Sequence, residues 1–276
     1  MMQHILSLSY GKDSLACLGA IEQLGWPLDR IIHAEVWATE TIPADPPLMI
    51  EFKAKADEII KKRWGIEVEH VCAMDGEKKR TYESMFYKLR KSGKSNGQIH
   101  GFPMQRGSWC NDRLKTRALD LIKRECISYI GIAADEPERY NRLTENQRSP
   151  LIEAGWTEKD CHQWCIENDL LSPVYNTATR SGCWFCHHQR VDQLRLLRKN
   201  YPEYWALMLK WDTDSPVTFT SNGRTLHDYD LRFELEDSGV VPIGKRFRWA
   251  DVLCHKQTPG QVSIKEVLAS DTAGVY

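Results

Sequence analysis

The chain has 276 residues, 42% of them hydrophobic and 27% charged, proportions typical of a soluble globular protein that can bury a full core. Its 37 Lys and Arg residues against 38 Asp and Glu give a net charge of −1, which argues against a protein that holds nucleic acid by bulk electrostatics alone. The sequence has no apolar run long enough to span a bilayer and no signal-peptide pattern, so we expect a cytoplasmic protein with no membrane partner.

Strands and helices alternate from the start of the chain. Residues 5–8 predict a short strand, and apolar residues at helical spacing predict a helix that follows it and ends at Gly25. Residues 31–37 predict a second strand, after which a helix runs from a proline-rich loop to about residue 64. Residues 66–72 alternate in polarity and predict a third strand.

The pattern changes twice after the third strand. Residues 73–108 show no clean period and predict a mobile insertion, and then residues 111–124 predict a helix before a fourth strand over residues 127–133. Alternating strands and helices imply βαβ units, so we expect an α/β domain over residues 1–150 with a parallel sheet flanked by helices. Residues 151–276 predict short helices and loops rich in Trp, Cys and Arg, which we interpret as a Cys-rich, mainly helical C-terminal region packed on the first domain.

The strongest motif lies between the first strand and the first helix, and it reads Ser9-Tyr10-Gly11-Lys12-Asp13-Ser14. Backbone N–H groups at a helix N-terminus attract phosphate oxygens, and Gly11 lets the backbone approach a ligand closely. Ser9 and Ser14 can donate hydroxyl hydrogen bonds, while Lys12 adds positive charge. A Walker A loop is excluded because the glycine five positions before its Gly-Lys pair is missing. An ordinary helix cap by Asp13 and Ser14 is the structural alternative.

This segment resembles the Ser-Gly-Gly-x-Asp-Ser loop of the PP-loop nucleotide α-hydrolases, and particularly that of the phosphoadenosine-phosphosulfate reductase family. Tyr10 stands where that loop has its first Gly. The resemblance implies a HUP-type, Rossmann-like sheet, a loop that grips pyrophosphate, and an adenine held at the edges of the first two strands, with ATP and Mg²⁺ as ligands. The cofactor-binding residues that it implies are Ser7, Leu8, Ser9, Tyr10, Gly11, Lys12, Asp13, Ser14, Val36, Trp37 and Gly131.

Two further segments are similar to this family, and the resemblance covers roughly residues 1–215. Residues 110–115 are similar to its Cys-Thr-x-x-Leu-Lys stretch, and residues 131–139 look like its Gly-Ile-Arg-x-x-Glu-x-x-Arg stretch, at the carboxyl end of a strand where open α/β sheets bind ligands. A surface ion pair between Glu136 and Arg139 is the alternative interpretation. The candidate catalytic residues are Lys12, Asp13, Lys115, Glu136 and Arg139.

Nine cysteines in a reducing compartment point to metal or redox chemistry for some of them. The C-x-x-C pair at residues 183–186 can present two thiolates to one metal; a thiol–disulfide couple and a plain structural role are the alternatives. Tetrahedral Zn²⁺ or a [4Fe–4S] cluster normally takes four ligands. Our expected quartet is Cys110, Cys165, Cys183 and Cys186, with Cys161 and His187 as alternates. Trp109 stands where cluster-carrying relatives would have an adjacent cysteine, so zinc and iron–sulfur both stay open.

Three functions fit these motifs. The first is an ATP pyrophosphatase that activates an acceptor for sulfur transfer to nucleic acid, as in DNA phosphorothioation or tRNA thiolation. The second is a phosphoadenosine-phosphosulfate reductase, but the Glu-Cys-Gly-(Ile/Leu)-His segment of those enzymes has no counterpart after Cys254. The third is a non-catalytic nucleotide-binding module, which intact Lys12, Asp13 and Ser14 disfavour. We therefore expect the pyrophosphatase.

The expected partners follow from this ranking. They are an adenine nucleotide, a nucleic-acid acceptor, and a cysteine desulfurase or other sulfur-donor protein. Basic residues that could meet a polyanion gather at residues 88–94 and at Arg113, Lys115 and Arg117, although a solvated surface explains such runs equally well. The sequence of residues 216–276 predicts no function for that segment.

Overall fold

The computed structural model describes residues 2–103, 108–120, 125–176, 182–244 and 246–256. Its main sheet has five parallel strands in the order β3-β2-β1-β6-β7. The bounds of these strands are Gln3–Ser7 for β1, Arg30–Glu35 for β2, Val68–Cys72 for β3, Cys126–Tyr129 for β6 and Gln147–Arg148 for β7. The chain moves from β1 outward to β2 and β3 and then returns to the other side of β1, so the strand order reverses between β1 and β6. Ligands of open α/β sheets bind at such a switch point.

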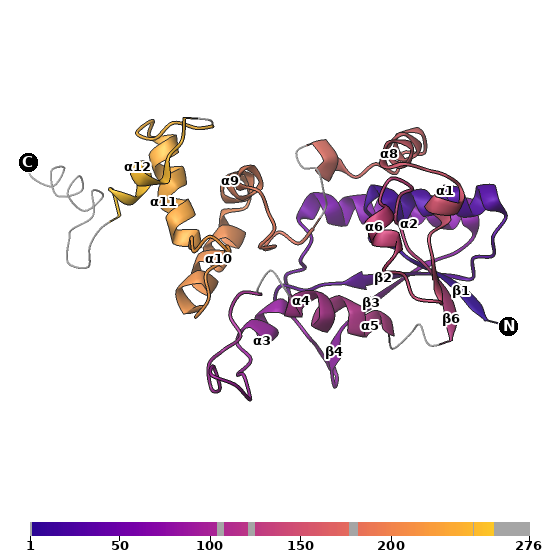
Figure 1. Cartoon of the computed structure of the whole chain (residues 1–276), viewed down its shortest axis with the longest axis horizontal. Coiled ribbons are helices and arrows are strands. Elements are labelled where there is room, and N and C mark those ends of the chain that lie inside the picture. The colour runs from indigo at the N-terminus through magenta and orange to yellow at the C-terminus, as the bar shows by residue number, and fades with distance from the viewer. Residues whose placement is uncertain (1, 104–107, 121–124, 177–181, 245, 257–276) are drawn as a thin grey trace, which may run out of the picture.

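Helices α1 (Lys12–Leu24) and α2 (Pro47–Trp64) connect the first three strands and lie together on one face of the sheet (Figure 1). Both helices end where a glycine takes up a left-handed conformation, Gly25 with φ 64° and Gly65 with φ 70°. Helices α7 (Pro150–Glu153) and α8 (Glu158–Glu167) pack against α1 on the same face. The parallel α/β fold with flanking helices is therefore confirmed.

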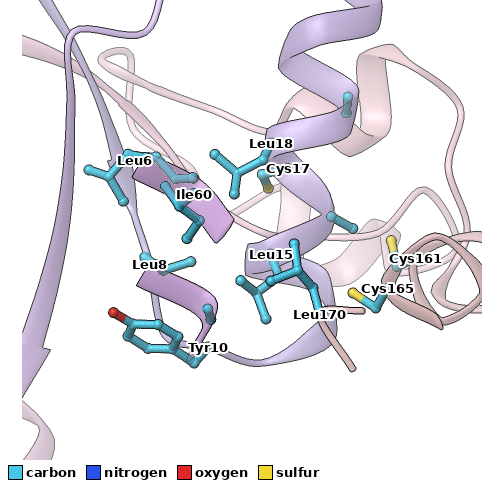
Figure 2. Close-up of a cluster of buried hydrophobic side chains, with 14 of the residues drawn as sticks. Leu6, Leu8, Tyr10, Leu15, Cys17, Leu18, Ile60, Cys161, Cys165 and Leu170 are labelled. Atoms are coloured by element: carbon cyan, nitrogen blue, oxygen red, sulfur yellow. The ribbon is translucent and has the colours of Figure 1, made fainter. Parts of the chain in front are cut away.

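The first hydrophobic core fills the space between the sheet and these helices. Figure 2 shows Leu6 and Leu8 from the β1 segment facing Leu15 and Leu18 of α1, with Cys161 and Cys165 of α8 beside them. On the opposite face of the sheet, Leu119 packs against Ile5 and Ile32. Alternate residues of β1 thus serve opposite faces, as the period of a buried strand requires.

Three predicted elements differ from the structure. The fourth strand ends at Tyr129 rather than at residue 133, because the chain then turns toward the loop after β1. The helix predicted over residues 111–124 is broken into α4 (Trp109–Asn111), a π-helical turn (Asp112–Thr116) and α5 (Arg117–Asp120), and residues 121–124 lie outside the described residues. The prediction that residues 73–108 form a mobile insertion is wrong for those parts of the segment that pack into a second hydrophobic core, described next.

A second hydrophobic core joins that insertion to the C-terminal helices. A small hairpin of β4 (Met74–Asp75) and β5 (Lys78–Lys79) leads to α3 (Tyr82–Phe86), whose Tyr82 and Phe86 are buried. Tyr82 packs on Phe185 with ring centroids 4.2 Å apart, and Trp184 stacks on Trp211 at 5.8 Å. The insertion has no clean period because its short elements bury isolated aromatic residues rather than a continuous face.

The helices of this second core are α9 (Val191–Asn200), α10 (Pro202–Asp214), α11 (Leu226–Asp237) and α12 (Trp249–Leu253). Ionic contacts brace them: Glu236, buried in α11, accepts from Arg195 and Arg232 at 2.8 and 2.7 Å. The part of residues 216–256 that the structure describes thus completes a core, a role that the sequence did not predict. Helices α7 and α8 belong to the first core, and the division at residue 150 and the Cys-rich character of the second region stay predictions. Among the described helices, none combines the length and apolar character needed to cross a membrane.

Candidate functional site

The loop between β1 and α1 is braced from inside by the hydroxyl of Ser14. Its Oγ donates to the carbonyl oxygen of Gly11 at 2.9 Å, so it must accept from the Ser9 backbone nitrogen at 3.1 Å and from Ser9 Oγ at 2.9 Å. Ser14 is only 6% exposed. The structure therefore gives Ser14 the task of shaping the loop, while the loop backbone lies at the carboxyl end of β1 and at the N-terminus of a thirteen-residue helix.

Tyr10 takes the left-handed conformation that usually selects glycine, with φ 57°. Its ring is fully buried, and its hydroxyl donates to Asp57 of α2 and accepts from Nε2 of His70 at 3.1 Å. Hydrogen bonds to Asp57 and Glu35 raise the pKa of His70 to about 9, so this imidazole is charged at neutral pH. Tyr10 was expected at the ligand, but its side chain points into the protein, so only its backbone can contact a ligand.

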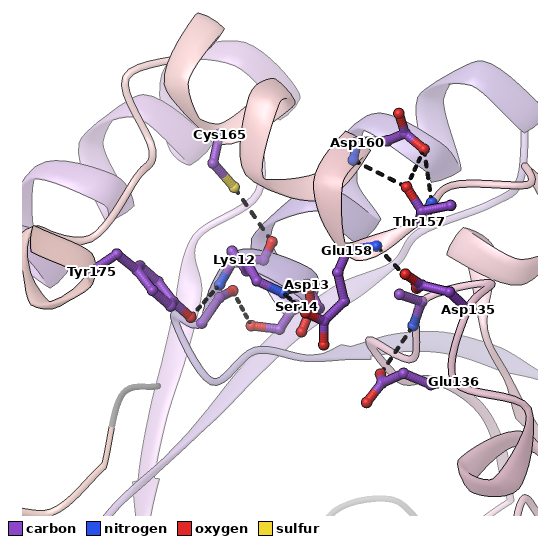
Figure 3. Close-up of polar contacts among 12 residues, drawn as sticks. Lys12, Asp13, Ser14, Asp135, Glu136, Thr157, Glu158, Asp160, Cys165 and Tyr175 are labelled. Carbon is purple, nitrogen blue, oxygen red and sulfur yellow. Dashed lines mark hydrogen bonds and ion pairs between the residues drawn. The ribbon is translucent and has the colours of Figure 1, made fainter. Parts of the chain in front are cut away.

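Three carboxylates meet beside the loop, those of Asp13, Glu136 and Glu158, with one oxygen from each within 4.8 Å of the others. Figure 3 shows Lys12 among them; its Nζ lies 2.7 Å from Asp13 and 3.4 Å from Glu158. Burial raises the pKa of Asp13 despite the contact with Lys12. Burial alone would lower the pKa of Lys12, but the two carboxylates outweigh it and the pKa is raised. Oxygen ligands of this kind suit Mg²⁺.

The segment after β6 brings Gly131 and Glu136 to the loop. A Cβ atom at residue 131 would lie 2.7 Å from the Ser14 backbone nitrogen, so only glycine fits there. Arg139 donates to both oxygens of Glu136, at 2.8 and 2.7 Å, and its side chain is half-exposed. Glu136 thus reaches the candidate site directly, whereas Arg139 forms the ion pair that was the structural alternative.

A cavity of about 240 Å³ opens beside the loop, between the ends of β1 and β2. Of the residues expected near an adenine, Ser7, Leu8 and Val36 line it. Trp37 does not; its ring is covered by the ammonium of Lys79, 3.0 Å from the ring centroid. The cavity also contains a polar set that the sequence analysis missed: buried His33 and Lys53 and half-buried Asp45.

The signal for this missed set was present in α2. Its buried residues include Met49, Phe52, Ala56 and Ile60 at helical spacing, and Lys53 lies on the same buried face. A lysine in such a position is rarely buried without partners and so marks a site worth testing. Two further residues near the loop, Glu158 and Tyr175, were missed because no sequence pattern marked them. The Tyr175 hydroxyl accepts from the Lys12 backbone nitrogen at 3.1 Å.

A second cavity of about 280 Å³ contains most of the predicted metal ligands. Cys110, Cys183 and Cys186 line it together with His187 and His188. All nine cysteines are free thiols, and burial raises the pKa of Cys183 to about 12, although nearby Lys115 acts in the opposite direction. Thiolates and an imidazole form a donor set that fits Zn²⁺ or an iron–sulfur cluster.

Cys165 does not join this group. It lies in α8 within the first core, where its Sγ donates to the Lys12 carbonyl oxygen at 3.3 Å, and its neighbour Cys161 is equally buried. The interpretation of Cys165 as the fourth ligand, with Cys161 as alternate, is therefore wrong in this structure, because α8 packs on α1 and not on the C-x-x-C segment. His187, the other alternate, lines the cavity. Within the described ranges, the acidic trio is the only three-ligand group within 4.8 Å, so the three thiols are more widely spaced.

The two cavities share one wall. Val36, Lys115, Gly182 and Cys183 line both of them, so the thiol cavity adjoins the cavity beside the loop. The π-helical turn directs Lys115 into this wall, while Arg113 and Arg117 lie on the surface with Nε atoms 3.3 and 3.5 Å from Asp112.

No protein-family model, no curated protein and no solved structure matches this chain. The function must therefore be inferred from the residues and geometry of the two cavities and the loop.

Proposed function

We propose that this protein is a PP-loop ATP pyrophosphatase of the phosphoadenosine-phosphosulfate reductase family, which cleaves ATP to AMP and pyrophosphate. The observation that carries the proposal is the position of residues 9–14. They link β1 to α1 at the reversal of strand order, against the backbone of Gly131. A helix N-terminus at such a switch point is the usual place for phosphates in this class of fold, and a HUP-type sheet fits this strand order.

The chemistry assigned to the loop is largely electrostatic. An acceptor oxygen attacks the α-phosphorus, the bond to the α–β bridging oxygen breaks, and pyrophosphate leaves with the negative charge that develops. Lys12 and the loop amides stabilise that charge. Asp13, Glu136 and Glu158 would hold Mg²⁺, which neutralises phosphate charge.

The adjoining thiol cavity supports a role in sulfur transfer. Cys110, Cys183, Cys186 and His187 would hold Zn²⁺ or a [4Fe–4S] cluster next to the nucleotide. In this proposal hydrosulfide, released from the donor protein's persulfide by a thiol that is oxidised to a disulfide, displaces AMP from the activated acceptor, so that one P–O or C–O bond is exchanged for a bond to sulfur. The acceptor is nucleic acid, as in DNA phosphorothioation, and a cysteine desulfurase or similar protein in the cytoplasm supplies the sulfur.

The test is the product pattern with ATP labelled at the α-phosphate. Labelled AMP, with pyrophosphate, supports the proposal; labelled ADP with free phosphate contradicts it. Lys12→Ala should lower the rate on the order of 100-fold, as for loss of one donor to a transition-state anion. Lys61→Ala, at an exposed lysine paired with Glu67, is the matched control and should leave the rate unchanged. Release of sulfite from phosphoadenosine phosphosulfate, without ATP cleavage, would assign the chain to the reductases instead.

A further inference from the structure

His33, Lys53 and Asp45 in the first cavity have one defined arrangement of hydrogen bonds. His33 lies 2.8 Å from the Leu8 carbonyl oxygen through Nδ1, so Nδ1 carries the proton and donates. Burial, reinforced by Lys53, lowers the pKa of His33 to about 3, so the ring is neutral and its Nε2 can only accept. Lys53 therefore donates to Nε2, at 2.8 Å, and to Oδ2 of Asp45.

Among the described residues, one donor and one acceptor of this arrangement have no hydrogen-bond partner, although Lys53 Nζ also lies 5.2 Å from the Tyr10 ring centroid. An ammonium has three N–H groups, and two of those on Lys53 are occupied. The structure gives Oδ1 of Asp45 no partner among the described residues. Lys53 and Asp45, with side chains 10% and 26% exposed, thus present adjacent hydrogen-bonding groups of opposite character on the cavity wall.

The size of the cavity indicates which part of a ligand meets this wall. At about 240 Å³ it is smaller than a pocket that encloses a whole ligand of nucleotide size, so it holds one portion. Ser9 of the loop lines one end, while Asp45 and Lys53 come from the α2 side. Lys53 and Lys115 line the cavity beside Asp45, so charge does not keep a phosphate out; the carboxylate of Asp45 suits a donor N–H group instead, which an ionised phosphate lacks. With the phosphates at the loop, ribose and base remain, and the base carries the adjacent donor and acceptor that this wall complements.

We propose that Asp45 and Lys53 read the 6-position edge of the purine and select a 6-amino over a 6-oxo base. This inference rests on the proposed nucleotide site and goes beyond it by naming the side chains that choose the base. Asp45 can only accept, so it meets the exocyclic amino group; Lys53 can only donate, so it meets ring nitrogen N1.

A 6-oxo purine reverses both groups. Rotation about the glycosidic bond does not interchange N1 and the 6-substituent of the base. Its O6 would face the Asp45 carboxylate and its N1–H would face the Lys53 ammonium. Both contacts are repulsive, and selectivity of this kind comes from penalising the wrong ligand as much as from binding the right one.

The experiment measures binding of AMP and IMP to the full chain by titration calorimetry, since neither ligand has an α–β bond to cleave and they differ only at this edge. The wild-type protein should bind AMP at least about 100-fold more tightly. Asp45→Asn should reduce that preference to less than about tenfold, because an amide can turn to offer either a donor or an acceptor. Pyrophosphate binding, which reports the loop alone, should not change.

Asp169→Asn is the matched control. Asp169 pairs with exposed Lys55, which lies on α2 as Lys53 does but outside the cavity. It should keep the full preference. If Asp45→Asn does not fold, the double variant Asp45→Asn/Lys53→Met leaves no unpaired charge and serves the same comparison.

Equal binding of AMP and IMP by the wild type, or an undiminished preference in Asp45→Asn, would overturn the inference while pyrophosphate binding still upheld the loop. A loss of discrimination between AMP and 2′-deoxy-AMP in Asp45→Asn, with the 6-position preference intact, would also overturn it by placing the ribose at this wall. Binding of neither pyrophosphate nor AMP would refute the proposed function, and this inference with it.

Discussion

Gly131 and Ser14 touch through their backbones: a Cβ at residue 131 would lie 2.7 Å from Ser14 N and 2.9 Å from Ser14 Cα. Backbone atoms cannot move aside as the end of a side chain can. The segment after β6 and the loop after β1 are therefore fitted to each other, and a change in one is transmitted to the other.

This contact predicts the effect of Gly131→Ala. The added methyl group should displace the loop, weaken pyrophosphate binding at least about tenfold and lower the free energy of unfolding by about 1–3 kcal/mol. Gly19→Ala is the comparison variant, because its Cβ would meet the Trp164 ring at 2.4 Å farther along α1 from the loop. It should cost similar stability with much less effect on binding. Equal losses of binding in both variants would contradict the prediction.

Tyr10 predicts a second pair of variants. Tyr10→Phe removes the hydroxyl between Asp57 and His70 and should lower the free energy of unfolding by about 1–2 kcal/mol. Tyr10→Gly relieves the left-handed backbone by about 1 kcal/mol but deletes a buried ring, so we expect a net loss of about 2–4 kcal/mol. Urea unfolding measures both. A Tyr10→Gly protein as stable as the wild type would show that the ring does not hold the loop.

The thiol cavity predicts which cysteines hold a metal. Cys110→Ser, Cys183→Ser or Cys186→Ser should each abolish or strongly reduce bound zinc or iron, because each removes one ligand of a shared site. Cys165→Ser should retain the full metal content, since its sulfur lies against the Lys12 carbonyl in the other core. Metal analysis of anaerobically purified protein decides this. Loss of metal in Cys165→Ser, with the fold intact, would restore the quartet expected from the sequence.

His70 predicts an alkaline loss of stability. Its pKa of about 9 in the folded protein lies above the ordinary value of 6.5, so the protonated form is stabilised by folding. The contribution of protonated His70 to the free energy of unfolding is complete below pH 6.5 and is lost as the pH rises through about 9. The urea midpoint should fall over that window, and less so in His70→Gln, which cannot titrate. His255→Gln, at an exposed histidine, should behave as the wild type.

The sequence predicted the elements with strong local signals. The helices that end at Gly25 and Gly65 and the first three parallel strands could be predicted because apolar spacing and glycine caps are local properties. The helix over residues 111–124 could not be resolved into its three pieces, since the π-helical turn that directs Lys115 into the cavity wall depends on tertiary packing.

The site was predicted only in part, because some of its residues carry local sequence patterns and others meet only through tertiary packing. The loop over residues 9–14 and Gly131 carry recognisable patterns, whereas His33, Asp45 and Lys53 are distant in sequence and meet only after β2 and α2 pack. Cys165 was misplaced because cysteine spacing does not indicate which core a helix joins. The second core was missed because its aromatic residues lie on many short elements with no common period.

That second core also sets an order of assembly. Phe86 and Phe102 come from the first half of the chain, yet they pack against Trp211 and Phe219, with ring centroids 6.1 and 5.2 Å apart. A ribosome releases the first pair long before the second, so the nascent chain must carry an uncovered aromatic surface until α10 has emerged. Contacts so distant along the chain close slowly. Premature termination between α9 and α10 would leave this surface bare, and such fragments should be targets for chaperones and proteases rather than stably folded proteins.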